Sequence, residues 1–316
     1  MAVLGIDIGG TKTIAAVADD NGRIIAKERM HTPREQGPDA VLSEIEFAGK
    51  LLLQEAELGR EQVKAIGIGC GGPLDRRRGI ILTAPNLPGW DDLPLAEYFE
   101  KSFGAPAYLD NDVNLAALGE ARRGAGAGVD HLAYFNIGTG IGGGIIIGGK
   151  LYRGCGNAGE FGHQIIEPKG PTCLCGKRGC LESLASGTSI ARRAKEYLAV
   201  HWDSLIVRMA GTVDKVTAES VAQAAREGDE LAQRIWRETG EYLGLGVANV
   251  VNILNPRRVV LGGGVIEAGD LILDPVRQTV RERAMTQLAE DVQIVPGALS
   301  DQAGIIGAIC LAIERG

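Results

Sequence analysis

Short apolar runs alternate with glycine-rich turns at the start of the chain. Ala2 to Ile8 is apolar, Gly9-Gly10-Thr11-Lys12 has the composition of a turn, and Thr13 to Ala18 is apolar again. The pair Asn21-Gly22, which favours a tight hairpin turn, then leads into Arg23 to Glu28. This pattern predicts a three-stranded meander whose first turn is rich in glycine.

The next segments alternate between a helical and an extended pattern. Pro38 to Leu58 has apolar residues near helical spacing, and Val63 to Gly69 is a short apolar run typical of a buried strand. Ala107 to Leu109 is a further candidate strand, and it ends at Asp110-Asn111-Asp112. Strands that alternate with a helix indicate an α/β layer.

A second copy of the opening pattern begins at His131. Leu132 to Ile137 leads into Gly138-Thr139-Gly140, and Gly142 to Ile147 follows. With a shift of 129 residues, Asp7-Ile8-Gly9 aligns with Asn136-Ile137-Gly138. The repeat predicts a duplicated fold that holds its ligand between the two halves.

The C-terminal half has mainly helical patterns. Helices are predicted over Thr188 to Val200, Thr217 to Glu227, Asp229 to Leu254, Asp270 to Ala289 and Asp301 to Glu314. Between the third and fourth of these, Arg258 to Leu261 is a predicted strand that runs into Gly262-Gly263-Gly264.

Composition and charge narrow the class of protein. The 316 residues are 45% hydrophobic, which is enough for buried cores, and the net charge of −7 gives no electrostatic footprint for nucleic acid. The N-terminus lacks a basic region before its first apolar run, and no apolar run approaches the ~18 residues of a membrane span. We therefore expect a cytoplasmic protein with no membrane partner.

Four candidate metal ligands lie close together in the sequence. His163, Cys173, Cys175 and Cys180 provide one imidazole and three thiols, the ligand set of a closed structural zinc site. A disulfide or separate buried thiols are the alternatives, but a reducing compartment favours metal. Four protein ligands leave no position for a zinc-activated water. The zinc would instead hold a loop that presents Glu160 and Glu182.

The glycine-rich turns point to a nucleotide. Gly67 to Gly72 and Gly138 to Gly143 match the dinucleotide pattern G-x-G-x-x-G, but a turn and a strand follow them where that motif needs a helix. A Walker A loop is also absent. Backbone N–H groups in hairpin turns can bind phosphate oxygens, with added bonds from Thr11 and Thr139, and Asp7 can orient hydrated Mg²⁺.

Several motifs together resemble those of the ROK family of sugar kinases. They are Asp7 to Lys12, Leu109 to Asp112, Gly138 to Gly140, Glu160 to His163, Cys173 to Glu182 and Gly262 to Gly264, and they occur in the family's order across nearly the whole chain. The resemblance implies an α/β, actin-like ATPase (ribonuclease H-like) duplicated fold with two lobes and a central cleft. We expect residues 1–114 and 302–316 in a small lobe and 115–301 in a larger lobe with the zinc loop.

The resemblance also implies roles for individual residues. Gly9, Gly10, Thr11, Lys12, Gly138, Thr139 and Gly140 would bind the phosphates of ATP, and Gly262, Gly263 and Gly264 would lie near its adenosine. Asp112 would be the catalytic base. Asn86, Asn111, Asp112, Glu160, His163 and Glu182 would bind the sugar, with His163 also a zinc ligand.

The chemistry of these residue types agrees with the expected roles. A carboxylate at a strand end can accept the proton of an attacking hydroxyl, and carboxylates with amides complement the hydroxyls of a sugar. Asp110 competes with Asp112, because residues two apart on a strand face the same side. Asn86 could equally be a turn residue on turn chemistry alone.

The expected reaction is ATP-dependent phosphorylation of glucose at its C6 hydroxyl, with ATP, Mg²⁺ and structural Zn²⁺ as cofactors. Kinases of N-acetylmannosamine, fructose or allose share most of these motifs, and polyphosphate replaces ATP in some relatives. A non-catalytic, sugar-sensing regulator is a further alternative, but the first strand begins too early for an N-terminal DNA reader. The resemblance also suggests a homodimer or homotetramer.

Overall fold

The computed structural model describes residues 1–200 and 203–316, which divide into two compact units. Unit 1 comprises Met1–Gly128, Leu151–Ala158 and Asp301–Gly316, and unit 2 comprises Val129–Lys150 and Gly159–Ser300. Helix α3 (Asp112–Arg123) contains the predicted lobe boundary at residue 114 and lies wholly within unit 1.

Unit 1 is built on a five-stranded sheet with the order β3-β2-β1-β4-β8. Its strands are β1 (Ala2–Ile8), β2 (Lys12–Asp19), β3 (Ile24–His31), β4 (Val63–Cys70) and β8 (Ala107–Asn111). β1 is antiparallel to β2 and parallel to β4, and β4 is parallel to β8. The predicted meander is confirmed, because β1, β2 and β3 are neighbours in this order.

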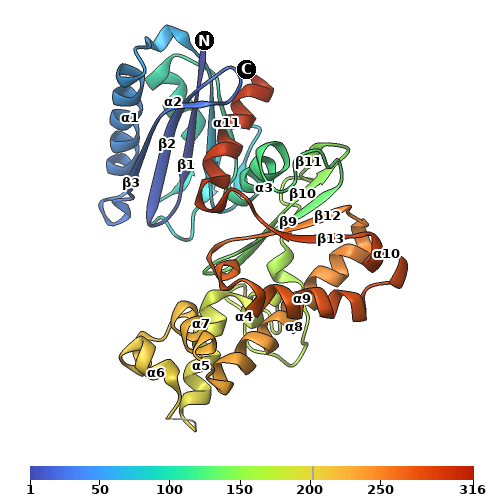
Figure 1. The fold of residues 1–316 in the computed structure, drawn as a ribbon. Coiled ribbons are helices and arrows are strands. Elements are labelled where there is room, and N and C mark those ends of the chain that lie inside the picture. Colours follow the sequence, from blue (N-terminus) through green and yellow to red (C-terminus); the bar gives the residue numbers. More distant parts are fainter. Residues whose placement is uncertain (201–202) are drawn as a thin grey trace. The chain divides into compact units, whose positions relative to one another are not determined.

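Helices cover both faces of this sheet (Figure 1). α1 (Pro38–Glu55) and α2 (Leu95–Phe103) share one apolar core with the alternate β1 residues Leu4, Ile6 and Ile8. On the other face, α11 (Ala303–Arg315) packs on β1 and β4 and against α3. A side chain at Gly67 would place its Cβ 1.9 Å from the carbonyl oxygen of Ala308, so α11 lies directly on the backbone of β4.

Unit 2 repeats this topology, with the strand order β11-β10-β9-β12-β13. The strands are β9 (Leu132–Ile137), β10 (Ile141–Ile147), β12 (Arg258–Gly262), β13 (Gln293–Pro296) and the short edge strand β11 (Lys150–Tyr152), at the boundary between the units. β9 is antiparallel to β10 and parallel to β12, as β1 is to β2 and β4. The predicted duplication is therefore confirmed, and the α/β fold is the actin-like one that the resemblance implies.

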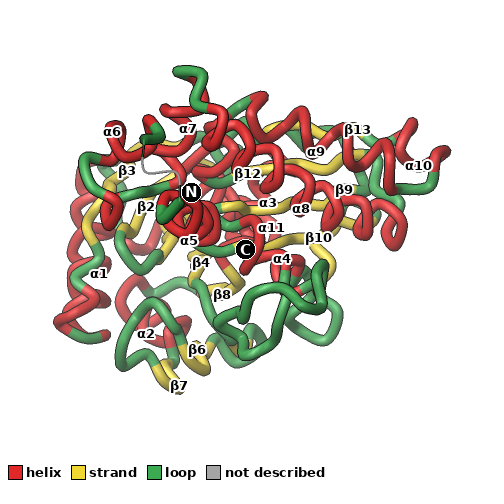
Figure 2. Tube along the Cα trace, turned by 90° about the horizontal axis from the view of Figure 1, so that it is seen from below, coloured by secondary structure: helices red, strands yellow, loops and turns green. Residues whose placement is uncertain are grey.

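The helices of unit 2 are α4 (Leu181–Ala185), α5 (Gly187–Leu198), α6 (Leu205–Ala210), α7 (Ala218–Arg226), α8 (Glu230–Leu254), α9 (Asp270–Arg283) and α10 (Thr286–Asp291). The long helix α8 packs against α7 and α9 (Figures 1 and 2). The single helix predicted over Asp270 to Ala289 is wrong, because extended backbone at Ala284 (φ −78°, ψ 162°) separates α9 from α10. The N–H of Met285 donates there to Asn252 instead of to the helix.

Irregular segments carry much of the remaining chain. Unit 1 has a small sheet of β5 (Leu74–Asp75), β6 (Ile80–Thr83) and β7 (Asp91–Leu93). Short 3-10 helices lie at Arg34–Gln36, Arg60–Gln62, Phe161–His163, Val213–Lys215, Gly264–Ala268 and Ser300–Gln302. The chain between β11 and α4 is almost entirely loop (Figure 2, green). Among the described residues, no helix is both long and apolar enough to cross a membrane.

Candidate active site

The first glycine loop joins β1 to β2 in unit 1. The N–H of Gly9 donates to the carbonyl of Lys12 at 2.9 Å, which closes the turn. A Cβ at Gly9 would lie 2.9 Å from that same carbonyl oxygen, and a Cβ at Gly10 would lie 2.8 Å from the Cβ of Asn86. Neither position has room for a side chain. The structure therefore brings the predicted residue Asn86, in the connection from β6 to β7, against the predicted phosphate loop.

Charged groups surround this loop. Burial, and after it the repulsion from the Asp112 carboxylate, raise the pKa of Asp7 to about 7, although the Lys12 ammonium acts in the opposite direction. The Lys12 Nζ atom lies 3.4 Å from Oδ2 of Asp301, and Nη1 of Arg29 lies 2.9 Å from the same oxygen. The end of β1 and the start of α3 thus hold two mutually repelling carboxylates, Asp7 and Asp112, an arrangement suited to a bound cation.

Asp110 is fully engaged with other protein groups. Its side chain is buried, and one carboxylate oxygen lies 2.7 Å from Nε and 2.6 Å from Nη2 of Arg153. The other oxygen accepts from the side chain of Asn114 at 3.0 Å and from the N–H of Asn111 at 2.9 Å. Asp110 therefore has a structural role at this strand end and is poorly placed to accept a substrate proton.

Asp112 occupies a different environment from Asp110. β8 ends at Asn111 and Asp112 is the first residue of α3, so the expectation that both aspartates face the same side of one strand is wrong. One Asp112 oxygen accepts the N–H of Val113 at 2.9 Å, and the other would lie 3.3 Å from a Cβ at Gly71. Asp112 is thus held at the helix start, beside the end of β4.

Asn111 caps helix α3. Its side-chain oxygen accepts the N–H groups of Val113 and Asn114 at 3.0 and 3.2 Å. This capping fixes the side chain and leaves its NH₂ group as the donor end. The geometry suits a single task towards a sugar, donation to a hydroxyl oxygen.

The four predicted metal ligands converge in unit 2. One ligand atom from each of His163, Cys173, Cys175 and Cys180 lies within 4.8 Å of the others. The Cys175 and Cys180 sulfurs are 3.7 Å apart, and Cys173 Sγ is 3.8 Å from His163 Nδ1. Four ligands around tetrahedral zinc, with Zn–S bonds of about 2.3 Å, would be separated by about 3.5 to 3.8 Å. The geometry and the donor set therefore fit zinc.

The two flanking glutamates lie beside different members of this cluster. His163 turns Nδ1 towards Cys173, and its Nε2 lies 3.9 Å from a carboxylate oxygen of the exposed Glu160. Glu182 lies 3.7 Å from Cys173 Sγ through one oxygen and accepts the N–H of Ile141 at 2.9 Å through the other. Glu182 thereby links the metal cluster to the end of the second glycine loop.

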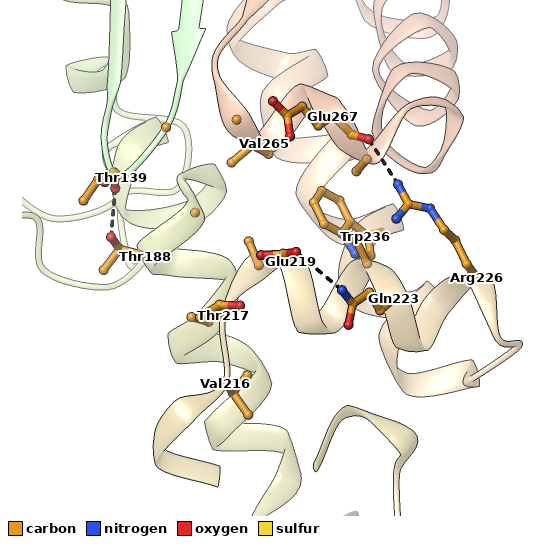
Figure 3. Close-up of a pocket in the computed structure, with 17 residues that line it drawn as sticks. Thr139, Thr188, Val216, Thr217, Glu219, Gln223, Arg226, Trp236, Val265 and Glu267 are labelled. Carbon is orange, nitrogen blue, oxygen red and sulfur yellow. Dashed lines mark hydrogen bonds between the residues drawn. The ribbon is translucent and has the colours of Figure 1, made fainter. Parts of the chain in front are cut away.

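The second glycine loop joins β9 to β10 as the first joins β1 to β2. The N–H of Gly138 donates to the carbonyl of Gly140 at 2.9 Å. The start of α5 holds this loop, because Gly187 N–H donates to the Gly138 carbonyl at 2.8 Å and the Thr188 hydroxyl donates to the Thr139 carbonyl at 2.9 Å (Figure 3). The loop thus lies at a helix N-terminus, where anions are favoured.

The glycines after β12 are required by close contacts. A Cβ at Gly262 would lie 2.3 Å from the Tyr134 hydroxyl, and a Cβ at Gly263, whose φ is +89°, would lie 2.4 Å from the Ile137 carbonyl. Gly264, by contrast, has open space beside it. This turn can therefore pass close to β9 and leave a hollow next to Gly264.

A cavity of about 780 Å³ lies in unit 2 between the second glycine loop and this turn (Figure 3). Gly138, Thr139, Gly187 and Thr188 line its polar end, and Val216, Ala222, Trp236, Val265 and Ala268 give it apolar walls. Glu219, Gln223, Arg226 and Glu267 also line it. The volume and the mixed lining suit a nucleoside with its phosphates directed to the glycine loop.

Most of the residues that line this cavity were not predicted from the sequence. Many of its lining residues come from α5, α7 and α8, whose sequence patterns indicate only helices. Trp236 is a large residue on a helix that has a buried face, so nothing in its spacing distinguishes a cavity wall from core. The Ser186-Gly187-Thr188 segment is the one usable signal, because a glycine between hydroxyls opens helix α5.

Comparisons with known proteins agree with this geometry. The ROK family model matches residues 3–315. Glucokinase of Thermotoga maritima is 36% identical (100% of this chain, 98% of that protein), and glucokinase of Streptomyces coelicolor is 37% identical (98% and 97%). A crystal structure of a ROK family glucokinase from Streptomyces griseus, in complex with glucose and AMPPNP, is 36% identical, covers 100% of both chains and has a TM-score of 0.83. The chain belongs to the ROK family.

Proposed function

We propose that this ROK sugar kinase transfers the γ-phosphate of ATP to the C6 hydroxyl of glucose. The observation that carries the proposal is the 780 Å³ cavity, which opens from the second glycine loop and has apolar walls for a base. A polyphosphate chain has no group to fill such walls, so the cavity favours a nucleoside triphosphate as donor. Glucose and AMPPNP in the similar Streptomyces griseus glucokinase support the same pair of substrates.

Unit 1 would supply the groups that act on the reacting atoms. Asp112 would accept the proton of the C6 hydroxyl late in phosphoryl transfer. Asp110 competes poorly for this role, because Arg153 and Asn114 occupy its oxygens. Asn86 and Asn111 would orient the sugar, and Gly10, Thr11 and Lys12 would stabilise charge on the transferred group.

Unit 2 would supply the remaining sugar and donor contacts. Glu160 and Glu182 would accept hydrogen bonds from sugar hydroxyls, and His163 would use Nε2 for a hydroxyl while Nδ1 binds metal. Gly138, Thr139 and Gly140 would hold phosphates, and Gly262, Gly263 and Gly264 would pass beside the adenosine.

Two metals belong to this proposal. Zinc on His163, Cys173, Cys175 and Cys180 would keep the Glu160 to Glu182 loop in shape, as a closed site does. Mg²⁺ near Asp7 would supply neutralisation of phosphate charge.

A sugar panel tests the proposal. ADP release would be measured with ATP and glucose, mannose, fructose, N-acetylmannosamine or N-acetylglucosamine as acceptor, and again with polyphosphate in place of ATP. We expect the highest kcat/KM for glucose with ATP. Equal values for all five sugars would defeat the glucose assignment, and turnover with polyphosphate alone would defeat the assignment of ATP.

Assembly and location follow from the family and from the thiols. We infer a homodimer or homotetramer, which sedimentation velocity would distinguish from a monomer. Three thiol ligands and the substrate ATP suit the reducing cytoplasm, where cysteines bind metal instead of pairing.

A further inference from the structure

Two buried hydroxyl groups lie beneath the first glycine loop. Thr13 and Thr32 are 1% and 0% exposed, and their hydroxyl oxygens are 2.9 Å apart. The Thr32 hydroxyl also lies 2.8 Å from the carbonyl oxygen of Gly9. We propose that Thr32 is a positioning residue that aims the N–H of Gly10 at the donor phosphates, an inference that rests on the proposed function of this loop.

The direction of the hydrogen bonds follows from the groups involved. A carbonyl oxygen only accepts, so the single proton of the Thr32 hydroxyl is donated to Gly9. The Thr13 hydroxyl must then donate to Thr32. The result is a directed chain from Thr13 through Thr32 to the Gly9 carbonyl, in which each bond strengthens the next.

The position of the Gly9 carbonyl determines where the next N–H points. In a planar trans peptide, the C=O of one residue and the N–H of the following residue point in opposite directions. Thr32 holds the Gly9 carbonyl on the side of the buried threonines, so the Gly10 N–H points away from them. In the proposed function, this is the side from which the donor phosphates approach the loop.

The loop needs such an anchor because it contains two adjacent glycines. Glycine has a wide range of backbone conformations, so the peptide between Gly9 and Gly10 is the least restrained unit of the turn. Two backbone hydrogen bonds hold the ends of the turn. Gly9 N–H donates to the Lys12 carbonyl at 2.9 Å, and Thr32 N–H donates to the Thr11 carbonyl at 3.0 Å. The side chain of Thr32 is therefore the group that fixes the peptide in the middle.

The test compares four variants with the wild-type chain. Thr32→Val keeps the shape and removes the hydroxyl, whereas Thr32→Ser keeps the hydroxyl. The double variant Thr13→Val/Thr32→Val removes both hydroxyls, so no buried donor is left unpaired and folding is preserved. Ile14→Val is the control, because Ile14 is buried on β2 next to Thr13 and its side chain makes no hydrogen bond.

Two measurements are made on each protein. The first is hydrogen exchange at the Gly9 and Gly10 amides of the ligand-free protein, and the second is kcat/KM for ATP and KM for glucose. We expect Thr32→Val and the double variant to exchange faster at these amides and to lose about 3- to 10-fold in kcat/KM for ATP, the range for one hydrogen bond. KM for glucose should change less than about 2-fold, and Thr32→Ser and Ile14→Val should behave like wild type.

The outcomes separate this inference from the proposed function. Unchanged amide exchange and unchanged kcat/KM for ATP in a folded Thr32→Val or double variant would overturn the inference. Equal losses for ATP and glucose, or the same loss in Ile14→Val, would also overturn it, since they indicate general damage. If the wild-type chain shows no ATP-dependent kinase activity, the proposed function fails, and amide exchange still decides whether Thr32 holds the loop.

Discussion

The carboxylate of Asp110 forms a buried ion pair with Arg153, 2.7 Å from its Nε and 2.6 Å from its Nη2. Asp110 is the second-last residue of β8, which ends at Asn111 just before Asp112. Arg153 belongs to the short segment Leu151–Ala158 that is part of unit 1. This pair gives Asp110 a structural role and thereby supports the proposal that Asp112 is the base.

Removing Arg153 should therefore lower the free energy of unfolding more than it lowers the catalytic activity. Arg153→Met leaves Asp110 as a buried charge with no cation beside it, at a cost of about 3 kcal/mol in the free energy of unfolding. Adding Asp110→Asn should recover much of that loss. Urea unfolding of the wild type, both single variants and the double variant measures the coupling, and additive losses would contradict a direct ion pair.

The raised pKa of Asp7 predicts that the stability of the protein depends on pH. Its folded pKa of about 7 lies above the usual 3.8, so the folded state binds this proton more tightly than the unfolded state does. As pH rises from about 4 to 7, the ligand-free protein therefore loses up to about 4 kcal/mol of stability through Asp7. Asp7→Asn should raise Tm at pH 8 by several degrees and have little effect at pH 4. A constant difference at both pH values would exclude this shift.

The zinc loop predicts linked losses of metal and sugar affinity. Cys175→Ser should lower zinc well below the one ion per chain expected for wild type and raise KM for glucose by about tenfold, in the range seen when support for a metal site is removed. Cys155→Ser is the matched control, because Cys155 is also exposed and lies outside the cluster. Metal analysis and sugar kinetics are measured together. Full activity in zinc-free protein would contradict the role given to the loop.

The cavity predicts a donor-specific defect. Ala222 lines its apolar wall, and Ala222→Leu adds a side chain in the space proposed for the nucleoside. We expect KM for ATP to rise about tenfold or more, equivalent to ~1.4 kcal/mol, with KM for glucose unchanged. Unaltered KM for ATP in a folded variant would place the nucleoside elsewhere.

Much of this fold is predictable because its signals are local. The strand, glycine turn, strand pattern occurs at Asp7 to Gly10 and again at Asn136 to Gly140, and the order of the two sheets confirms the repeat. The break at Ala284 was not predictable, because the helical pattern continues through it and the bond from Met285 to Asn252 is a tertiary contact.

The candidate site, like the fold, combines features that the sequence predicts with features that it does not. The cluster of His163 with Cys173, Cys175 and Cys180 is predictable, because the chemistry and spacing of these residues are unusual. The different environments of Asp110 and Asp112 are not predictable, because they depend on where β8 ends and on Arg153, a residue 43 positions from Asp110. Thr32 has no motif around it, and only the fold places it under Gly9.

The most direct test of the account is kcat for glucose phosphorylation in Asp112→Asn at saturating ATP and glucose. Asparagine keeps the size and can still accept the N–H of Val113, but it cannot accept the proton, so we predict a loss of at least ~10²-fold with an unchanged Tm. Asp110→Asn, measured alongside, should retain far more activity and lose stability. Near-normal turnover in folded Asp112→Asn would contradict the assignment of Asp112 as the catalytic base.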